Sequence, residues 1–168
     1  LKPDYAEASH ILSSLTGKTT NSAPREYVEN LFDGYASKFD QSLVVDLSYD
    51  IPEVVTQLAV EKHGGGSLGS ILDLGCGTGR WAKSVAPKVK SLICIDPSNA
   101  LDIAKKNLSN FDNCEFYSAT VDEIPMEDNS MDFGYSLGVL HHVPDTALGI
   151  KQCVDKLKHG APFLLYLY

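Results

Sequence analysis

The sequence predicts an α/β protein built on a doubly wound, mostly parallel β-sheet with helices on both faces. Three observations lead to this class. Short apolar runs alternate with helical patterns through the second half of the chain, a glycine-rich turn follows the first apolar run, and the last run is continuously apolar. Alternating strands and helices form βαβ units, and a continuously apolar strand is expected to be covered on both faces.

The alternation begins after the glycine run at 64–66. Short apolar runs mark the expected strands, which are Ser70–Leu74, Ser91–Ile95, Glu115–Ser118, Met131–Leu137 and Pro162–Tyr168. Apolar residues at three- and four-residue steps mark the helices between them, Arg80–Ala86, Ala100–Leu108 and Asp145–Lys158. Because parallel crossovers are right-handed and a doubly wound sheet reverses beside its first strand, we expect the strand order 3-2-1-4-5.

Helical patterns precede the sheet. Residues 5–15 are typical of a short helix, and Pro52–His63 of another with Val54 on its inner side. With 168 residues, the chain is long enough for one well-buried domain. We therefore expect a helical N-terminal segment over 1–63 and one core domain over 64–168.

Composition excludes several classes of function. The formal net charge of −8 disfavours nucleic acid, whose binding depends on Lys and Arg. The four cysteines are scattered, with no C-x-x-C pair and no His at metal spacing, so neither a zinc site nor a disulfide framework is expected. No apolar run approaches the ~20 residues of a membrane span. We expect a cytoplasmic protein without nucleic-acid, membrane or metal binding.

A glycine-rich turn is the motif that carries chemistry. The turn at 75–79 lies directly between a buried strand and a helix, where a ligand can approach the backbone because no Cβ obstructs it. The next strand ends at Asp96, about twenty residues after the first glycine, where an acid can accept hydrogen bonds from both ribose hydroxyls. Together the turn and Asp96 predict a nucleoside ligand.

The spacing of the glycines separates two kinds of nucleoside. A dinucleotide fingerprint reads G-x-G-x-x-G, whereas this turn reads G-x-G-x-G and follows Asp73. An acid beside the turn would repel a pyrophosphate but can hold the ammonium group of a methionine moiety. The sequence therefore favours S-adenosylmethionine, and a nicotinamide-dependent oxidoreductase is disfavoured further by the absence of a Tyr-x-x-x-Lys motif.

Three motifs follow one another in this half of the chain: DLGCGTG, IDPS and MDFGYSLGVLHHVPD. Together they resemble the class I S-adenosylmethionine-dependent methyltransferases, from about Ile71 to Tyr168. The resemblance implies a Rossmann-like fold. It also implies that the methionine part of the cofactor meets Asp73, Gly75, Cys76 and Gly77. Asp96 would bind the ribose, and the adenine would be flanked by Pro97 and Ser98.

The segment Ala119–Pro125 resembles the adenine loop of that family, commonly G-D-A-E-x-L-P. Aligned on the proline, the usual Asp of the loop becomes Thr120 here. The resemblance then implies that the Thr120 hydroxyl meets the adenine amine and that the Val121 N–H serves a ring nitrogen. Asp122 belongs to the same expected loop contact.

Two further residues complete the expected cofactor contacts. Leu137 ends the fourth expected strand. Tyr35 belongs to Tyr27–Asp40, which resembles the segment before the core in bacterial methyltransferases linked to tetratricopeptide repeats. That resemblance implies that Tyr35 caps the cofactor, although an aromatic residue at helical spacing also suits plain core packing.

The pair His141-His142 follows the fourth strand, at the edge where open α/β sheets bind ligands. One of the two is a candidate general base that faces the acceptor, and a capping or packing role is the competing interpretation.

The function expected from these features is methyl transfer from S-adenosylmethionine to an unidentified small-molecule acceptor, leaving S-adenosylhomocysteine. The alternative is a module that binds either compound without catalysis. The family usually has seven strands, whereas five are expected before Tyr168. Since an apolar edge strand invites aggregation, we expect that the native chain continues or that this edge pairs with another copy.

Overall fold

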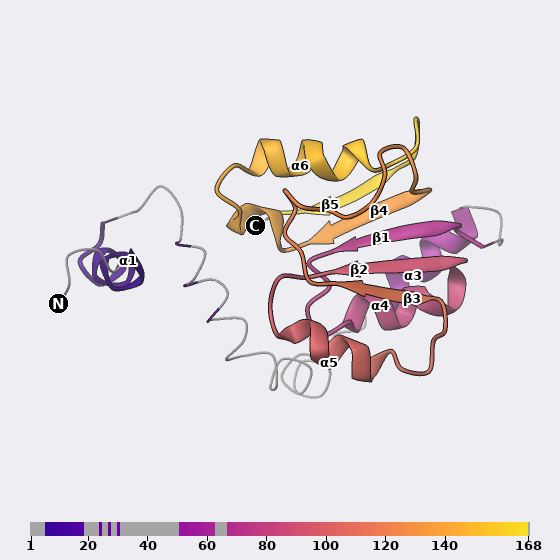
Figure 1. Cartoon of the computed structure of the whole chain (residues 1–168), viewed down its shortest axis with the longest axis horizontal. Coiled ribbons are helices and arrows are strands. Elements are labelled where there is room, and N and C mark those ends of the chain that lie inside the picture. Colours follow the sequence, from indigo (N-terminus) through magenta and orange to yellow (C-terminus); the bar gives the residue numbers. More distant parts are fainter. Residues whose placement is uncertain are drawn as a thin grey trace.

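The computed structural model describes residues 6–18, 24, 27, 30, 51–62 and 67–167. Five parallel strands form one sheet in the order β3-β2-β1-β4-β5 (Figure 1), which confirms the expected order. The strands are β1 Ser70–Leu74, β2 Ser91–Ile95, β3 Cys114–Tyr117, β4 Phe133–Leu137 and β5 Phe163–Tyr166. The helices are α1 Ala6–Leu15, α3 Ile51–Lys62, α4 Arg80–Val85, α5 Ala100–Asn107 and α6 Thr146–Asp155, with 3-10 turns η2 Ala86–Lys88 and η3 Leu140–His142.

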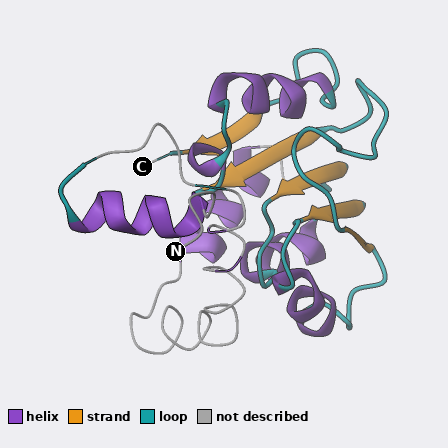
Figure 2. Cartoon of the chain, turned by 60° about the vertical axis from the view of Figure 1, so that its left-hand side comes forward, coloured by secondary structure: helices purple, strands orange, loops and turns teal. Residues whose placement is uncertain are grey.

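The sheet lies between two helical layers. Successive residues of β1 point to opposite faces, so Ile71 packs in a cluster with α4 and α5, whereas Leu72 and Leu74 pack in a cluster with α6. Figure 1 shows α6 on one side of the sheet and α5 on the other, and Figure 2 shows helices on both sides of the strands from another direction. This layering is the Rossmann-like, doubly wound arrangement that the alternating pattern predicts.

The central strand β1 fixes where a ligand site can form. It pairs with β2 on one side and with β4 on the other, so the winding direction changes between β1 and β4. Asp73 is opposite Cys94 on β2 and opposite Tyr135 on β4. The loops after β1, β2 and β4 therefore leave the sheet at one edge, which is where open α/β sheets bind ligands.

Two sequence-based expectations about packing are wrong. The closing strand β5 is not covered on both faces, because Leu164 is 37% exposed and Tyr166 is 58% exposed. Their neighbours Phe163 and Leu165 pack on the α6 side, so β5 alternates as an edge strand paired only with β4. In α3, Val54 is 48% exposed, and the helix instead buries Pro52 and Thr56.

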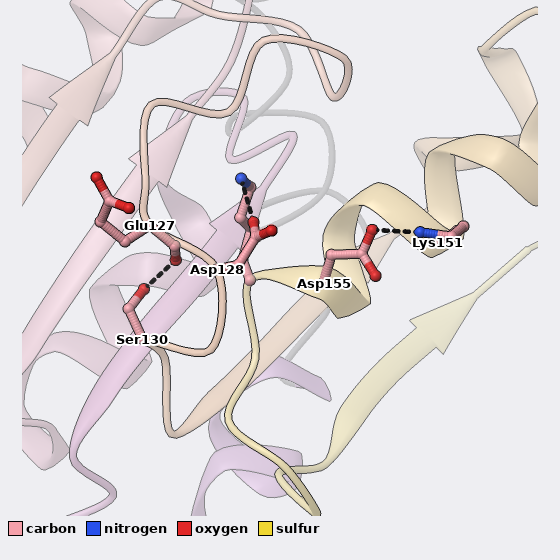
Figure 3. A network of polar contacts seen from close by, with 6 residues as sticks. Glu127, Asp128, Ser130, Lys151 and Asp155 are labelled. Carbon is pink, nitrogen blue, oxygen red and sulfur yellow. Dashed lines mark hydrogen bonds and ion pairs between the residues drawn. The ribbon is translucent and has the colours of Figure 1, made fainter.

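A loop before β4 is fastened to the C-terminal end of α6. The backbone N–H of Asn129 donates to the Asp155 carbonyl at 3.0 Å, and the Lys156 ammonium bonds Asp128 at 2.7 Å. Figure 3 shows this region, including the hydrogen bond from the Ser130 hydroxyl to the carbonyl of Glu127. These contacts fix the entry into β4 on the opposite end from its ligand-facing edge.

Candidate functional site

The glycine turn is held to the end of β2 by its own backbone. The N–H groups of Gly75 and Cys76 both donate to the Ile95 carbonyl, at 2.8 and 3.1 Å. The Gly79 N–H then donates to the Cys76 carbonyl at 2.9 Å, just before α4 begins. On the other side, the Asn107 amide of α5 donates to the Thr78 carbonyl at 2.9 Å. The turn is therefore a fixed surface rather than a free loop.

Two of the glycines have different physical roles. Gly75 has φ +78°, and a Cβ there would lie 2.4 Å from the Val139 side chain, so this glycine makes room for the loop after β4. Gly77 has φ +53° and no described atom within 4 Å of an added Cβ. The backbone at Gly77 is therefore open, as the approach of a ligand to the turn requires.

Cys76, between these two glycines, is buried, and contact with Cys94 and burial raise the pKa of its thiol. This is the environment of a packing residue, not of a nucleophile.

Asp96 joins the turn to the loop after β2. One carboxylate oxygen, Oδ2, accepts the Gly77 N–H at 2.8 Å, and Oδ1 accepts the N–H of Ser98 at 2.9 Å and the Ser98 hydroxyl. The carboxyl group is buried, with 7% of Asp96 exposed, while Pro97 beside it is exposed. Because a carboxylate offers about four acceptor positions, Asp96 retains capacity for a further hydroxyl donor. The two motifs predicted to share a ligand are thus bonded to each other.

Asp73 lies beneath the turn and is almost fully buried, at 2% exposed. Its Oδ2 accepts a hydrogen bond from the Tyr135 hydroxyl at 2.7 Å. Burial raises the pKa of Asp73 to about 7, the bond from Tyr135 opposes that rise, and the nearby Asp96 charge adds to it. Tyr135 was not among the expected site residues, although a tyrosine within an otherwise apolar strand opposite an acid is a signal for such a bond.

The loop after β4 crosses the turn. The Gly138 N–H donates to the Tyr166 carbonyl at 2.9 Å, and Val139 packs against Gly75. The 3-10 turn η3 then carries His141 and His142, whose ring centroids are 3.9 Å apart with a tilt of 47°. Burial lowers the pKa of both imidazoles, and the charge of His141 lowers that of His142 further. Both histidines are therefore held toward the neutral form, which can accept a proton.

The expected adenine loop lies against α6. Val121 is close to Gly149, where an added Cβ would be 3.5 Å from its side chain, and Asp122 is exposed. The Thr120 hydroxyl oxygen is buried and has no hydrogen-bond partner among the described residues. A buried hydroxyl without a protein partner suits a ligand donor or acceptor.

Two more residues were expected to contact the cofactor, Leu137 and Tyr35. Leu137 is half-buried at the end of β4 and lines an apolar hollow together with Thr56, Trp81 and Leu164. Tyr35 lies outside the described residues.

Comparison with known proteins identifies the family to which this fold belongs. The methyltransferase domain family matches residues 72–165, which is more than half of the chain. The chain belongs to this methyltransferase family. The match confirms the expected class of protein and, with it, S-adenosylmethionine as the cofactor of the family.

A curated relative agrees with this family assignment. A demethylmenaquinone methyltransferase from Staphylococcus aureus (strain JH9) is 28% identical over 145 residues, covering 83% of this chain and 59% of the relative. The chain thus spans about three-fifths of the length of that relative.

Solved structures show how widely the fold is shared. A proposed S-adenosyl-L-methionine-dependent methyltransferase from Methanococcus maripaludis superimposes with a TM-score of 0.71 at 24% identity, covering 81% of this chain and 64% of that one. The [4+2]-cyclase SpnF superimposes with a TM-score of 0.56 at 23% identity, covering 63% of this chain and 41% of that one. Since a cyclase has the same fold, the fold alone does not decide the reaction.

The candidate site fits S-adenosylmethionine, the cofactor of this family, in chemical terms. The open backbone at Gly77 and the side chains of Asp96 and Thr120 lie on loops at one edge of the sheet. The carboxyl group of Asp73 lies near the end of β1 at the same edge. Together these groups match a ligand with positive charge, ribose hydroxyls and a hydrogen-bonding base. Within the described ranges, no cluster of His, Cys, Asp and Glu could hold a metal ion, and no helix there is long and apolar enough to span a membrane.

Proposed function

We propose that this protein transfers the methyl group of S-adenosylmethionine to a small-molecule acceptor. The observation that carries the proposal is the meeting of Asp73, Gly77 and Asp96 at one sheet edge, with Gly77 bonded directly to Asp96. Two carboxyl groups beside open backbone suit a ligand that has both a ribose and positive charge. When bound, S-adenosylmethionine supplies a methyl group on a positively charged sulfur, already activated for transfer.

The residues of the chain bind and orient that ligand. Asp73 attracts the ammonium group of the methionine part, and Asp96 accepts a ribose hydroxyl at its remaining acceptor position. The hydroxyl of Thr120 and the N–H of Val121 hold the adenine. Alignment of the methyl group with the acceptor and exclusion of water are then the main contributions of the protein to the rate. The product, S-adenosylhomocysteine, keeps the same contacts.

The remaining assigned residues complete this proposed site. Gly75 and Cys76 shape the turn beneath the methionine part, Pro97 and Ser98 border the adenine with Asp122, and Leu137 closes the apolar side. The proposal also includes the division into a helical segment over 1–63, with Tyr35 as a cap on the cofactor, and a core over 64–168.

A proton on the acceptor is removed by a histidine in this proposal. The pair His141 and His142 is on the loop that packs over Gly75, and burial lowers the pKa of each imidazole. A neutral imidazole can take a proton from a hydroxyl or amine acceptor as the methyl group moves. The base is needed only when the nucleophile is protonated and weakly acidic.

A small organic acceptor is favoured by two observations. The formal net charge of −8 opposes the phosphate backbone of nucleic acid. The relative from Staphylococcus aureus is named for methylation of demethylmenaquinone. A cytoplasmic location is part of the proposal, and the four free cysteines support it, because free thiols persist in a reducing compartment.

The test is methyl transfer itself, measured with the full-length protein and methyl-labelled S-adenosylmethionine. The protein is offered a panel of small hydroxyl, amine and quinol acceptors, and both labelled product and S-adenosylhomocysteine are quantified. We expect stoichiometric formation of both with an authentic acceptor, and neither with Asp96→Ala. Tight cofactor binding without transfer to any acceptor would favour the non-catalytic module instead.

A further inference from the structure

Tyr135 is a buried tyrosine whose hydroxyl donates a hydrogen bond to the carboxyl group of Asp73. The two residues are opposite each other in the register of β4 and β1, so their side chains lie on the same face of the sheet. Tyr135 is 3% exposed and Asp73 is 2% exposed, and the hydroxyl lies 2.7 Å from Oδ2. A hydrogen bond between groups this deeply buried keeps one fixed geometry, because neither can exchange its partner for bulk water.

The bond leaves the other oxygen of Asp73 available. Among the described residues, no hydrogen bond to Oδ1 of Asp73 occurs, whereas Oδ2 is taken by Tyr135. The hollow beside the Tyr135 ring is lined mainly by apolar side chains. The Thr56 hydroxyl, which also lines it, donates to the Pro52 carbonyl at 2.6 Å. The phenol therefore sets the direction in which the free oxygen of Asp73 points.

The bond from Tyr135 favours the ionised form of Asp73, whereas the surroundings of this carboxyl group disfavour it. Burial and the Asp96 carboxylate both disfavour a charge on Asp73, and the Tyr135 hydroxyl is the influence that favours it. The other titratable neighbours are the thiols of Cys76, Cys94 and Cys114, which interact with this cluster as weak acids.

The helices beside this face carry charged groups of their own, among them Arg80 on α4 and Glu53 on α3. The Glu53 carboxylate accepts a hydrogen bond from the Ser84 hydroxyl at 2.8 Å.

We propose that Tyr135 is a positioning residue, whose hydroxyl holds the carboxyl group of Asp73 so that its free oxygen meets the ammonium group of the cofactor. This inference rests on the proposed function, because it requires that Asp73 receives the methionine part of S-adenosylmethionine. Tyr135 touches neither the transferred group nor the acceptor. Its effect is confined to ligands that carry the ammonium group.

The test compares two ligands in wild-type protein and Tyr135→Phe by calorimetric titration between about pH 5.5 and 8.5. S-adenosylmethionine carries the ammonium group, and adenosine lacks the whole methionine part. In the wild type, affinity for S-adenosylmethionine should rise as pH increases through about 7, because Asp73 must ionise to attract the cation. Above about pH 8 the affinity should fall again in both proteins, because the amino group of the ligand loses its proton.

In Tyr135→Phe the rise of affinity with pH should move to higher pH, because the hydrogen bond that favours the ionised form of Asp73 is gone. Affinity for S-adenosylmethionine at pH 7 should fall by about tenfold or more, the usual effect of losing a hydrogen bond to a charged group. Affinity for adenosine should stay unchanged. Tyr117→Phe is the matched control, since that hydroxyl bonds the Glu115 carboxylate at 2.8 Å on the outer strand β3.

Three outcomes would overturn the inference. The first is an unchanged affinity and pH midpoint in Tyr135→Phe, and the second is an equal loss for both ligands at every pH, which is the mark of a merely structural role. The third outcome is used if Tyr135→Phe does not fold. Wild-type affinity for S-adenosylmethionine in Asp73→Asn, with Tyr135 intact, would then overturn the inference. If wild-type protein itself fails to bind S-adenosylmethionine while remaining folded, the proposed function falls together with this inference.

Discussion

The two sides of the candidate site are built differently. The proposed cofactor side consists of strand ends and a glycine turn, tied together by backbone hydrogen bonds to Ile95 and by the bond between Gly77 and Asp96. The proposed acceptor side consists of the 3-10 turn η3, which carries two half-buried histidines. A rigid binding surface suits a ligand that is common to a whole family. A loop, in contrast, can differ in sequence between proteins with different acceptors without disturbing the sheet.

This difference separates the effects of mutation. Changes on the acceptor side should alter turnover and leave cofactor affinity intact. Changes on the cofactor side should alter affinity and, where the backbone is strained or a carboxyl group is buried, the free energy of unfolding.

The largest expected effect is on turnover. If His141 or His142 is the general base, its replacement by Ala should lower kcat by roughly 10²- to 10⁴-fold with cofactor affinity nearly unchanged. Because burial lowers the pKa of both imidazoles, the wild-type kcat at saturating S-adenosylmethionine should hold as pH falls through about 6.5 and decline only below it. Steady-state kinetics of the full-length protein with an authentic acceptor measure both. Normal turnover in both variants would mean that catalysis rests on alignment alone.

A second comparison uses two glycines of one turn. Gly75→Ala places a Cβ at positive φ and against Val139, so unfolding free energy should fall by about 2–5 kcal/mol. Gly77→Ala has positive φ but open space, so its loss should be only about 1 kcal/mol while cofactor affinity drops sharply. Chemical denaturation and ligand titration of both variants give the two quantities. A Gly77→Ala protein that binds the cofactor normally would remove Gly77 from the site.

Asp73 should make the ligand-free protein less stable at higher pH. Its folded-state pKa is raised to about 7, so its stability contribution is complete below the unfolded value near 3.9 and is lost as pH rises through about 7. Asp73→Asn should therefore match the wild type near pH 4 and exceed it by about 2–4 kcal/mol at pH 8. Denaturation curves at both pH values measure this. A stability difference that is independent of pH would show that Asp73 is not held neutral in the fold.

The smallest expected effect concerns Thr120. Thr120→Val keeps the shape and removes the hydroxyl, which has no partner among the described residues, so the ligand-free stability should change little. Affinity for S-adenosylmethionine should fall by about five- to tenfold, as expected for one lost hydrogen bond. Thr120→Ser is the matched control, because it retains the hydroxyl and should keep most of the affinity. An affinity of Thr120→Val equal to that of the wild type would show that Thr120 does not contact the adenine and that the alignment of this loop on the proline is wrong.

The sequence predicted which elements meet beside the glycine turn, because the signals for those elements are local. Strands β1 and β2 are short apolar runs, and the glycine spacing and Asp96 follow them directly, so their meeting at one edge is a consequence of parallel pairing. Strand β4 was expected from Met131, whereas the structure begins it at Phe133, because the loop before it is fastened to α6.

What the sequence did not predict depends on partners distant in the chain. The bond between Tyr135 and Asp73 joins residues 62 positions apart, and its existence depends on the register of β4 against β1. The exposure of Leu164 and Tyr166 depends on what covers the edge strand, which an apolar run cannot reveal. Whether His141 or His142 faces the acceptor is likewise a matter of loop conformation rather than of spacing.

The most direct measurement is the thermal shift of this protein with S-adenosylmethionine, S-adenosylhomocysteine and a nicotinamide dinucleotide. At about one hundred times Kd, the first two should stabilise the folded state by about 2.7 kcal/mol, which is a rise in Tm of roughly 5–10 °C. The dinucleotide should give no rise, and Asp96→Ala should lose most of the rise with S-adenosylmethionine even if its own Tm is lower. Stabilisation by the dinucleotide without stabilisation by S-adenosylmethionine would contradict the assignment of this turn to a methyl donor.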